Sequence, residues 1–183
     1  MAILKHGVPQ RNDWLSLDDD AALPEGAPVI VSLARWQAER NGLIQRNAPV
    51  GVRLKSDQSP AALAGDLERI SLVAIEFPKF TDGRGFSYAR LLRDRFGYAG
   101  EIRAVGQVLR DQYLFMVRCG IDAIEVPDDS SVQGYLEALG EFSVWYQPAS
   151  DDRATVVHRR HAPRAGRGSS PVINESVAAI WAY

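Results

Sequence analysis

The stretch LVAIEFPKFTDGRGFSYARLLRDRFGYAGEIRAV, residues 72–105, decides the fold class. Its two apolar runs, 72–77 and 101–105, have the length and composition of buried strands. Between them, residues 86–96 place apolar side chains on one helical face and end before Gly97, which suits a left-handed C-terminal cap. A strand, a helix and a strand in this order predict two parallel strands joined by a crossover helix.

The same alternation continues on both sides of this unit. Further strands are predicted at 29–33, 50–54, 122–126 and 144–146. Further helices are predicted near 60–69, over 109–119 and after the capping-box spacing of 130–133. The sequence therefore predicts an α/β fold with a parallel sheet of about six strands and crossover helices, as an open sheet or an incomplete β/α barrel.

Two flanking segments differ in composition from the α/β domain expected over residues 28–148. Residues 1–27 contain Pro9, Pro24 and Gly26, and they predict an irregular N-terminal arm with at most one short strand. Residues 149–183 form a basic, Gly-, Ser- and Pro-containing tail that is expected to be partly flexible. Its apolar end, residues 177–183, is expected to dock on the domain or on another subunit. Docking on another subunit would make the protein a homo-oligomer.

Composition excludes several classes of protein. The 183 residues are 46% hydrophobic and 24% charged, which is typical of one soluble globular core. Cys119 is the single cysteine, so no disulfide and no four-cysteine metal site can form within the chain. Without a signal peptide or a membrane-length apolar run, the sequence predicts a cytoplasmic protein without membrane contact. A net charge of −2 disfavours nucleic-acid binding.

The candidate site lies in two turns that each follow a predicted strand. Ligands of parallel α/β proteins bind at the carboxyl ends of strands, so both turns are expected on one edge of the sheet. Arg84 offers a planar fork to a carboxylate, a phosphate or a sulfur oxyanion. The competing interpretation is a turn with a capping Asp82 and a structural salt bridge. The candidate ligand-binding residues are Lys79, Asp82, Gly83, Arg84, Gly85, Gln107, Arg110 and Asp111.

Other conspicuous residues favour structural roles. Asp128 and Asp129 precede a predicted helix and are interpreted as caps, and Cys119 as a buried, inert thiol. The pair His158 and His161 has no neighbouring carboxylate, so no metal is predicted. Trp36, Tyr135 and Trp145 are interpreted as core or interface residues. No cofactor is predicted and no catalytic residue is assigned.

Residues 75–93 and 100–112, with 118–123 and 146–148, resemble the domain of unknown function nine-three-four family; the resemblance extends over residues 28–148. Genes of that family commonly lie beside assimilatory sulfite reductase, and some members are labelled oxidoreductases. The resemblance implies an accessory protein of assimilatory sulfite reduction that binds sulfite reductase or its electron donor.

The alternative is a small-molecule enzyme or an oxyanion-binding protein that uses the Lys, Arg and Asp rim. A flavin or nicotinamide oxidoreductase is disfavoured because no Gly-x-Gly-x-x-Gly follows a strand.

Overall fold

An eight-stranded mixed sheet forms the centre of the computed structural model, which describes residues 2–127, 132–151 and 153–161. The strand order is β2-β1-β8-β7-β6-β5-β4-β3. From β3 to β8 neighbouring strands are parallel, whereas β1 is antiparallel to both β8 and β2. The strands are β1 (Ala2–Lys5), β2 (Val8–Gln10), β3 (Leu15–Ser16), β4 (Val29–Ser32), β5 (Val50–Leu54), β6 (Leu72–Phe77), β7 (Glu101–Gly106) and β8 (Ala123–Val126).

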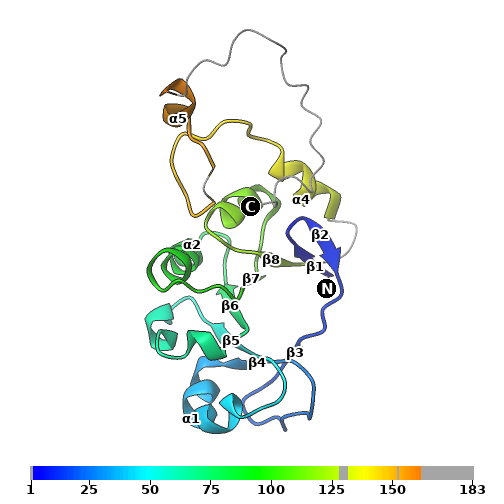
Figure 1. Ribbon diagram of the computed structural model, residues 1–183. Coiled ribbons are helices and arrows are strands. Elements are labelled where there is room, and N and C mark those ends of the chain that lie inside the picture. The colour runs from blue at the N-terminus through cyan, green and yellow to red at the C-terminus, as the bar shows by residue number, and fades with distance from the viewer. Residues whose placement is uncertain (1, 128–131, 152, 162–183) are drawn as a thin grey trace.

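The sheet is curled into an open half-barrel (Figure 1). Its two edge strands, β2 and β3, are joined by residues 11–14 alone. Seven strand spacings in a flat sheet would separate these edges by about 34 Å. The five Cα steps from Gln10 to Leu15 can span at most about 18 Å. The short connection therefore requires the sheet to curl until its edges approach each other.

Helices between the parallel strands cover the convex face of the sheet (Figure 1). The main core lies there, where strand residues such as Val52 and Ile75 pack with helix residues such as Trp36 and Leu92. The helical elements are α1 (Leu33–Ile44), the 3₁₀ turns η1 (Pro60–Leu63) and η2 (Leu67–Arg69), α2 (Arg84–Arg90) with its π-helical continuation η3 (Leu91–Arg95), α3 (Arg110–Arg118), α4 (Val132–Leu139) and α5 (Val156–His161).

The N-terminal arm lies against the concave face. Trp14 packs against a second, smaller buried cluster on that face, which consists of Ile30, Leu72, Ala74 and Val105. Two arginines of the sheet also bind the arm. Arg53 donates a hydrogen bond to the Ser16 hydroxyl (2.6 Å), and Arg103 donates one to the Asn12 side chain (3.0 Å). The expectation of one short strand in the arm is corrected to three short strands, β1, β2 and β3, and the arm supplies both edges of the sheet.

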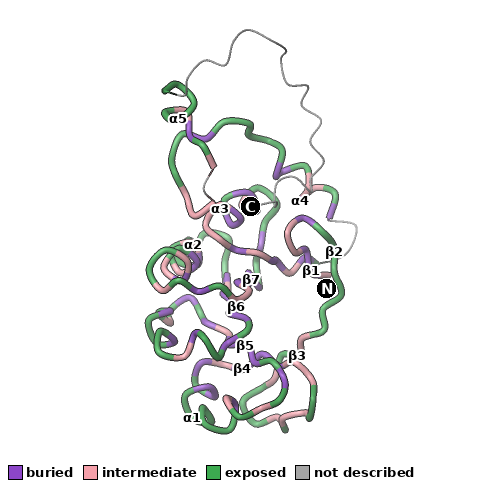
Figure 2. The backbone as a smooth tube through the Cα atoms, in the orientation of Figure 1, coloured by how far each residue is buried: buried purple, intermediate pink, exposed green. Residues whose placement is uncertain are grey.

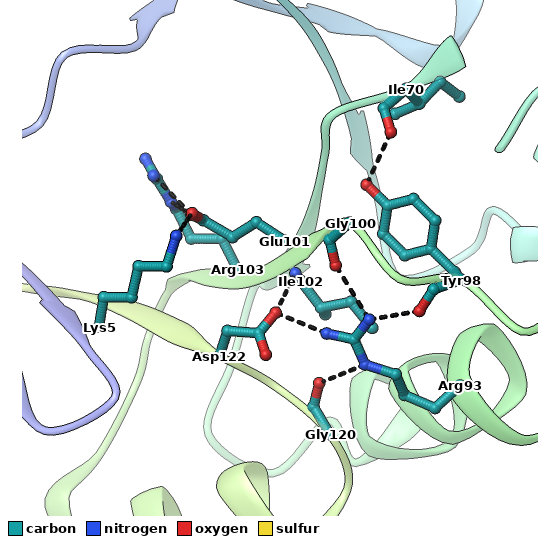
Figure 3. Close-up of polar contacts among 10 residues, drawn as sticks. All are labelled: Lys5, Ile70, Arg93, Tyr98, Gly100, Glu101, Ile102, Arg103, Gly120 and Asp122. Atoms are coloured by element: carbon teal, nitrogen blue, oxygen red, sulfur yellow. Dashed lines mark hydrogen bonds and ion pairs between the residues drawn. The ribbon is translucent and has the colours of Figure 1, made fainter. Parts of the chain in front are cut away.

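Charged side chains fix the amino-terminal edge of the sheet (Figure 3). Arg93 pairs with Asp122 at 2.5 Å and donates to the carbonyl oxygens of Tyr98, Gly100 and Gly120. Asp122 also accepts from the backbone N–H of Ile102, at 2.8 Å. One guanidinium thus connects the segments that lead into β7 and β8, which makes this network a structural element of the fold.

The five predicted strands from 29–33 to 122–126 correspond to β4–β8 and are confirmed. The sheet is nevertheless mixed and has more strands than the predicted six, because the arm adds β1, β2 and β3.

The strand predicted at 144–146 is wrong: this segment forms only an isolated bridge between Trp145 and Thr155. Arg118 donates to the Gln147 carbonyl and holds the segment beside α3, away from the sheet.

The helix predictions are confirmed with changed boundaries. The helix expected over 109–119 is α3, and the one over 86–96 is α2 with η3. In place of the helix expected near 60–69 the structure has two 3₁₀ turns, η1 and η2, separated by residues 64–66. Residues Asp128, Asp129 and the first two positions of the predicted capping box lie outside the described residues.

Candidate functional site

The turns after β6 and β7 lie together at the carboxyl edge of the sheet. The N–H of Phe80 in the first turn donates to the Gln107 side chain (3.3 Å), and the Gln112 side chain donates to the Phe80 carbonyl (2.8 Å). The N–H of Gln107 donates to the carbonyl of Phe77 at 2.8 Å. The structure therefore brings the two turns of the candidate rim into direct contact.

Asp82 and Arg84 satisfy each other within this rim. The Arg84 guanidinium donates two parallel hydrogen bonds to the Asp82 carboxylate, at 2.9 and 2.7 Å, and a third to the Ser56 hydroxyl at 3.0 Å. Hydrogen bonding from Arg84 holds the pKa of Asp82 well below its usual range. Since the fork of Arg84 already binds a carboxylate, an external anion would have to compete with Asp82.

Packing explains the buried glycine of the turn. Gly85 is buried, and a Cβ at this position would lie 2.4 Å from the ring of Phe77. Gly83 is exposed, and a Cβ there would have its nearest neighbour 4.0 Å away, on Phe86. The close approach of the α2 backbone to Phe77 therefore requires glycine at position 85.

Lys79, Arg110 and Asp111 are exposed at the same rim. None of the three forms an ion pair with another residue in the part of the chain that the structure describes. The side chain of Arg110 lies against Gly134 of α4, where a Cβ would approach its Cδ to 3.0 Å. Two cationic groups of the predicted site thus remain open to solvent.

A second candidate site is an apolar depression of about 430 Å³ beside α3. We call it the aromatic groove; it is lined by Phe115, Arg118, Phe142, Val144, Trp145, Tyr146 and Gln147. Four of its apolar side chains are strongly exposed: Phe115 is 49% exposed, Phe142 49%, Val144 47% and Tyr146 83%. Figure 2 shows the largely exposed course of the segment between α4 and α5 that carries most of them.

The floor of the aromatic groove is rigidly supported. Trp145 is 7% exposed, and the Arg118 guanidinium carbon lies 4.4 Å from the centroid of its ring. Arg153 lies over the same ring at 5.2 Å. Both arginines pair with Asp151, at 3.0 Å for Arg118 and 3.6 Å for Arg153. Because cations and a carboxylate fix the indole in place, the exposed side chains around it are presented on a fixed base.

Sequence reasoning did not identify the aromatic groove as a site. The available signal was the apolar run of Phe142, Val144 and Tyr146 at alternate positions, which predicts a strand with one apolar face. The interpretation of Trp36, Tyr135 and Trp145 as core residues is confirmed, since all three are buried. Cys119 was expected to be buried but is half-buried, and this partial burial raises the pKa of its thiol.

A family described as "Bacterial protein of unknown function (DUF934)" matches residues 51–157. The chain belongs to the DUF934 family. No curated protein matches the sequence. The DUF934 match begins in β5 and ends at the start of α5, so it includes the rim and the whole aromatic groove.

Two further properties of this DUF934 protein bear on its chemistry. Within the described residues no three His, Cys, Asp or Glu side chains are grouped as a metal ion would require. Among the same residues, no helix has both the length and the apolar character needed to cross a membrane. His158 and His161 lie on α5, where His158 contacts the Thr155 hydroxyl at 2.8 Å.

Proposed function

We propose that this DUF934 protein is a cytoplasmic, non-catalytic accessory protein of assimilatory sulfite reduction, and that it binds sulfite reductase or its electron donor through the aromatic groove. The observation that carries the binding role is the exposure of Phe115, Phe142, Val144 and Tyr146 around one apolar depression. Contiguous exposed apolar surface of this kind is typical of protein interaction sites.

The chemistry of the aromatic groove suits a protein partner. Aromatic side chains and arginine are enriched at the centres of interfaces, and a few such residues supply most of the binding energy. Here exposed Phe142 and Tyr146 stand beside a fixed Trp145, so little side-chain ordering is needed at the base of the contact. A preorganised surface loses less conformational entropy on binding.

The link to sulfite reduction rests on the family resemblance. The resemblance implies genes adjacent to assimilatory sulfite reductase, and co-encoded proteins often act on the same complex. The predicted rim supports a binding role more weakly, because Arg84 and Asp82 neutralise each other there.

The test is binding of the purified full chain to assimilatory sulfite reductase and, separately, to its electron donor. The double substitution of Phe142→Ala with Tyr146→Ala should weaken binding to one of them at least tenfold. Phe80→Ala is the matched control, because Phe80 is an aromatic side chain of similar exposure, 53%, and is not among the residues that line the groove. Equal binding by the double variant and the wild type would refute the docking role of the groove.

Oxyanion binding at the rim is the second candidate function. It is favoured by the exposed cations Lys79 and Arg110, which have no ion-pair partner in the described part of the chain. Calorimetric titration with sulfite, sulfate and phosphate tests it. Arg84→Ala should weaken anion binding more than it lowers the melting temperature, with Arg90→Ala on the same helix as the control. Unchanged anion binding both in Arg84→Ala and in the double variant of Lys79→Ala with Arg110→Ala would remove this candidate.

A further inference from the structure

The chain leaves the described part of the structure beside the aromatic groove. The N–H of Val156, the first residue of α5, donates to the carbonyl of Trp145 in the groove floor at 2.7 Å. Trp145 and Thr155 also form a parallel bridge. α5 ends at His161, the last described residue, so residues 162–183 continue from a point tied to the groove.

The sequence beyond α5 contains a segment whose chemistry matches the groove. Residues 177–183, Val-Ala-Ala-Ile-Trp-Ala-Tyr, carry no charged side chain and include two aromatic rings. They follow residues 162–176, which contain arginine, glycine, serine and proline. An apolar segment adjoining a polar one is the composition expected of a tethered docking peptide, since burial of its aliphatic and aromatic side chains supplies the binding free energy.

The connection is long enough to allow this contact. Residues 162–176 can span up to about 50 Å in extended form, so chain length does not prevent residues 177–183 from reaching the groove. A segment tethered near its binding site has an effective concentration at that site in the millimolar range. This is about a thousandfold above the concentration of a partner protein that is present at about 1 μM. Even a weak contact is therefore populated within the same chain.

We infer that residues 177–183 of the same chain occupy the aromatic groove in the absence of a partner. Occupancy would remove Phe142, Val144 and Tyr146 from water, and it would make the segment a competitor of any protein that binds there. The occupancy itself is independent of the proposed function; only the competition with sulfite reductase or its electron donor rests on it.

A peptide of residues 172–183 with an N-terminal fluorophore tests the inference by fluorescence anisotropy. Three full-length proteins are compared: the wild type, the variant with Ile180→Ser and Trp181→Ser, and that variant with Phe142→Ala and Tyr146→Ala added. Serine at 180 and 181 should empty the groove without shortening the chain. We expect saturable peptide binding to the first variant, at least tenfold weaker binding to the wild type, and none to the variant that also lacks the groove side chains.

Equal peptide binding by the wild type and the first variant, or binding by neither, would overturn the inference.

Light scattering of the wild type gives the second measurement. A mass of one chain supports occupancy by the same chain. A mass of two chains that falls to one chain in the variant with Ile180→Ser and Trp181→Ser would overturn that assignment and give the segment to a second copy. The partner assay separates the two proposals. Suppose that Phe142→Ala with Tyr146→Ala abolishes binding to sulfite reductase, while the peptide binds equally to the wild type and to the variant with Ile180→Ser and Trp181→Ser. This result would leave the proposed function intact and refute the occupancy.

Discussion

The guanidinium of Arg118 stacks on the ring of Trp145 and pairs with the carboxylate of Asp151 at 3.0 Å. The guanidinium also donates to the Gln147 carbonyl, and the backbone carbonyl of Arg118 accepts from the N–H of Ser150. A single residue at the end of α3 therefore holds the segment after α4 against the domain. The aromatic groove exists because of this attachment.

Replacing Arg118 should loosen the groove. Arg118→Ala leaves the nearly buried Asp151 with only the longer contact to Arg153, so we expect a loss of about 2–3 kcal/mol in the free energy of unfolding. The emission of the indole of Trp145 should shift toward longer wavelengths, as in water. Urea titration followed by fluorescence measures both. Arg118→Lys, which keeps the charge, should retain part of the stability; identical behaviour of both variants would contradict the assigned geometry.

Arg93 should be one of the most important charged residues for stability. Arg93→Met removes the partner of Asp122 and leaves three carbonyl oxygens without their donor, so we expect a loss of about 3–5 kcal/mol. The matched control is Arg90→Met on the same helix, whose pair with Asp94 is exposed and should contribute less than about 1 kcal/mol. Comparable losses in the two variants, measured by chemical denaturation, would argue against the network of Figure 3.

The two glycines of the rim turn should respond differently to alanine. Gly85→Ala places a methyl group against the ring of Phe77 and should cost about 1–3 kcal/mol of stability. Gly83→Ala meets only an ordinary contact with Phe86, at 4.0 Å, and should be nearly neutral. A smaller side chain at position 77, as in Phe77→Leu, should partly rescue Gly85→Ala. Thermal melts of Gly83→Ala, Gly85→Ala, Phe77→Leu and the combination of Gly85→Ala with Phe77→Leu decide the point, and a neutral Gly85→Ala would contradict the close approach.

Glu101 should contribute stability that depends on pH. Burial opposes its ionisation, but hydrogen bonds from Lys5 and Arg103 outweigh this effect, so the pKa of Glu101 is lowered in the folded protein. A lowered pKa means that the folded state binds the proton more weakly than the unfolded state. The contribution is therefore present above the unfolded pKa, about 4.3, and is lost as pH falls below it.

Denaturation of Glu101→Gln and wild type between pH 3 and pH 7 tests this expectation. The difference in the free energy of unfolding should be largest near pH 7 and should shrink toward pH 3. A difference that stays constant over the whole range would show that the carboxylate charge of Glu101 does not stabilise the fold.

The central sheet could be predicted from sequence because its strands are buried on both faces. Runs such as Leu72–Phe77 are apolar at almost every position and are followed by helical periodicity. β1 was missed because its four residues contain only two buried side chains, and its partner, β8, lies far away in the sequence. A short antiparallel strand whose main partner is remote in sequence carries little local signal.

The position of the candidate rim could be predicted from the sequence, but the pairing of its charged side chains could not. Parallel strands place both turns on one edge, and the contact between Gln107 and Phe80 follows from that topology. The bidentate pair of Asp82 and Arg84 depends on side-chain orientation that no spacing rule gives. The aromatic groove depends on the long-range contact of Arg118 with Asp151, which sequence patterns do not reveal.

The pairing of β1 with β8 affects how the chain can fold during synthesis. Ala2 lies opposite Val126, so during synthesis β1 can pair with β2 at once, but its other neighbour, β8, follows only about 120 residues later. At about 5–20 residues per second, that interval lasts roughly 6–25 s. Strands β4 to β7 can assemble with their helices in the meantime, and the hairpin of β1 and β2 then adds to a partly formed sheet. A fusion placed directly before β1 should therefore interfere chiefly with this late step, the pairing of β1 with β8.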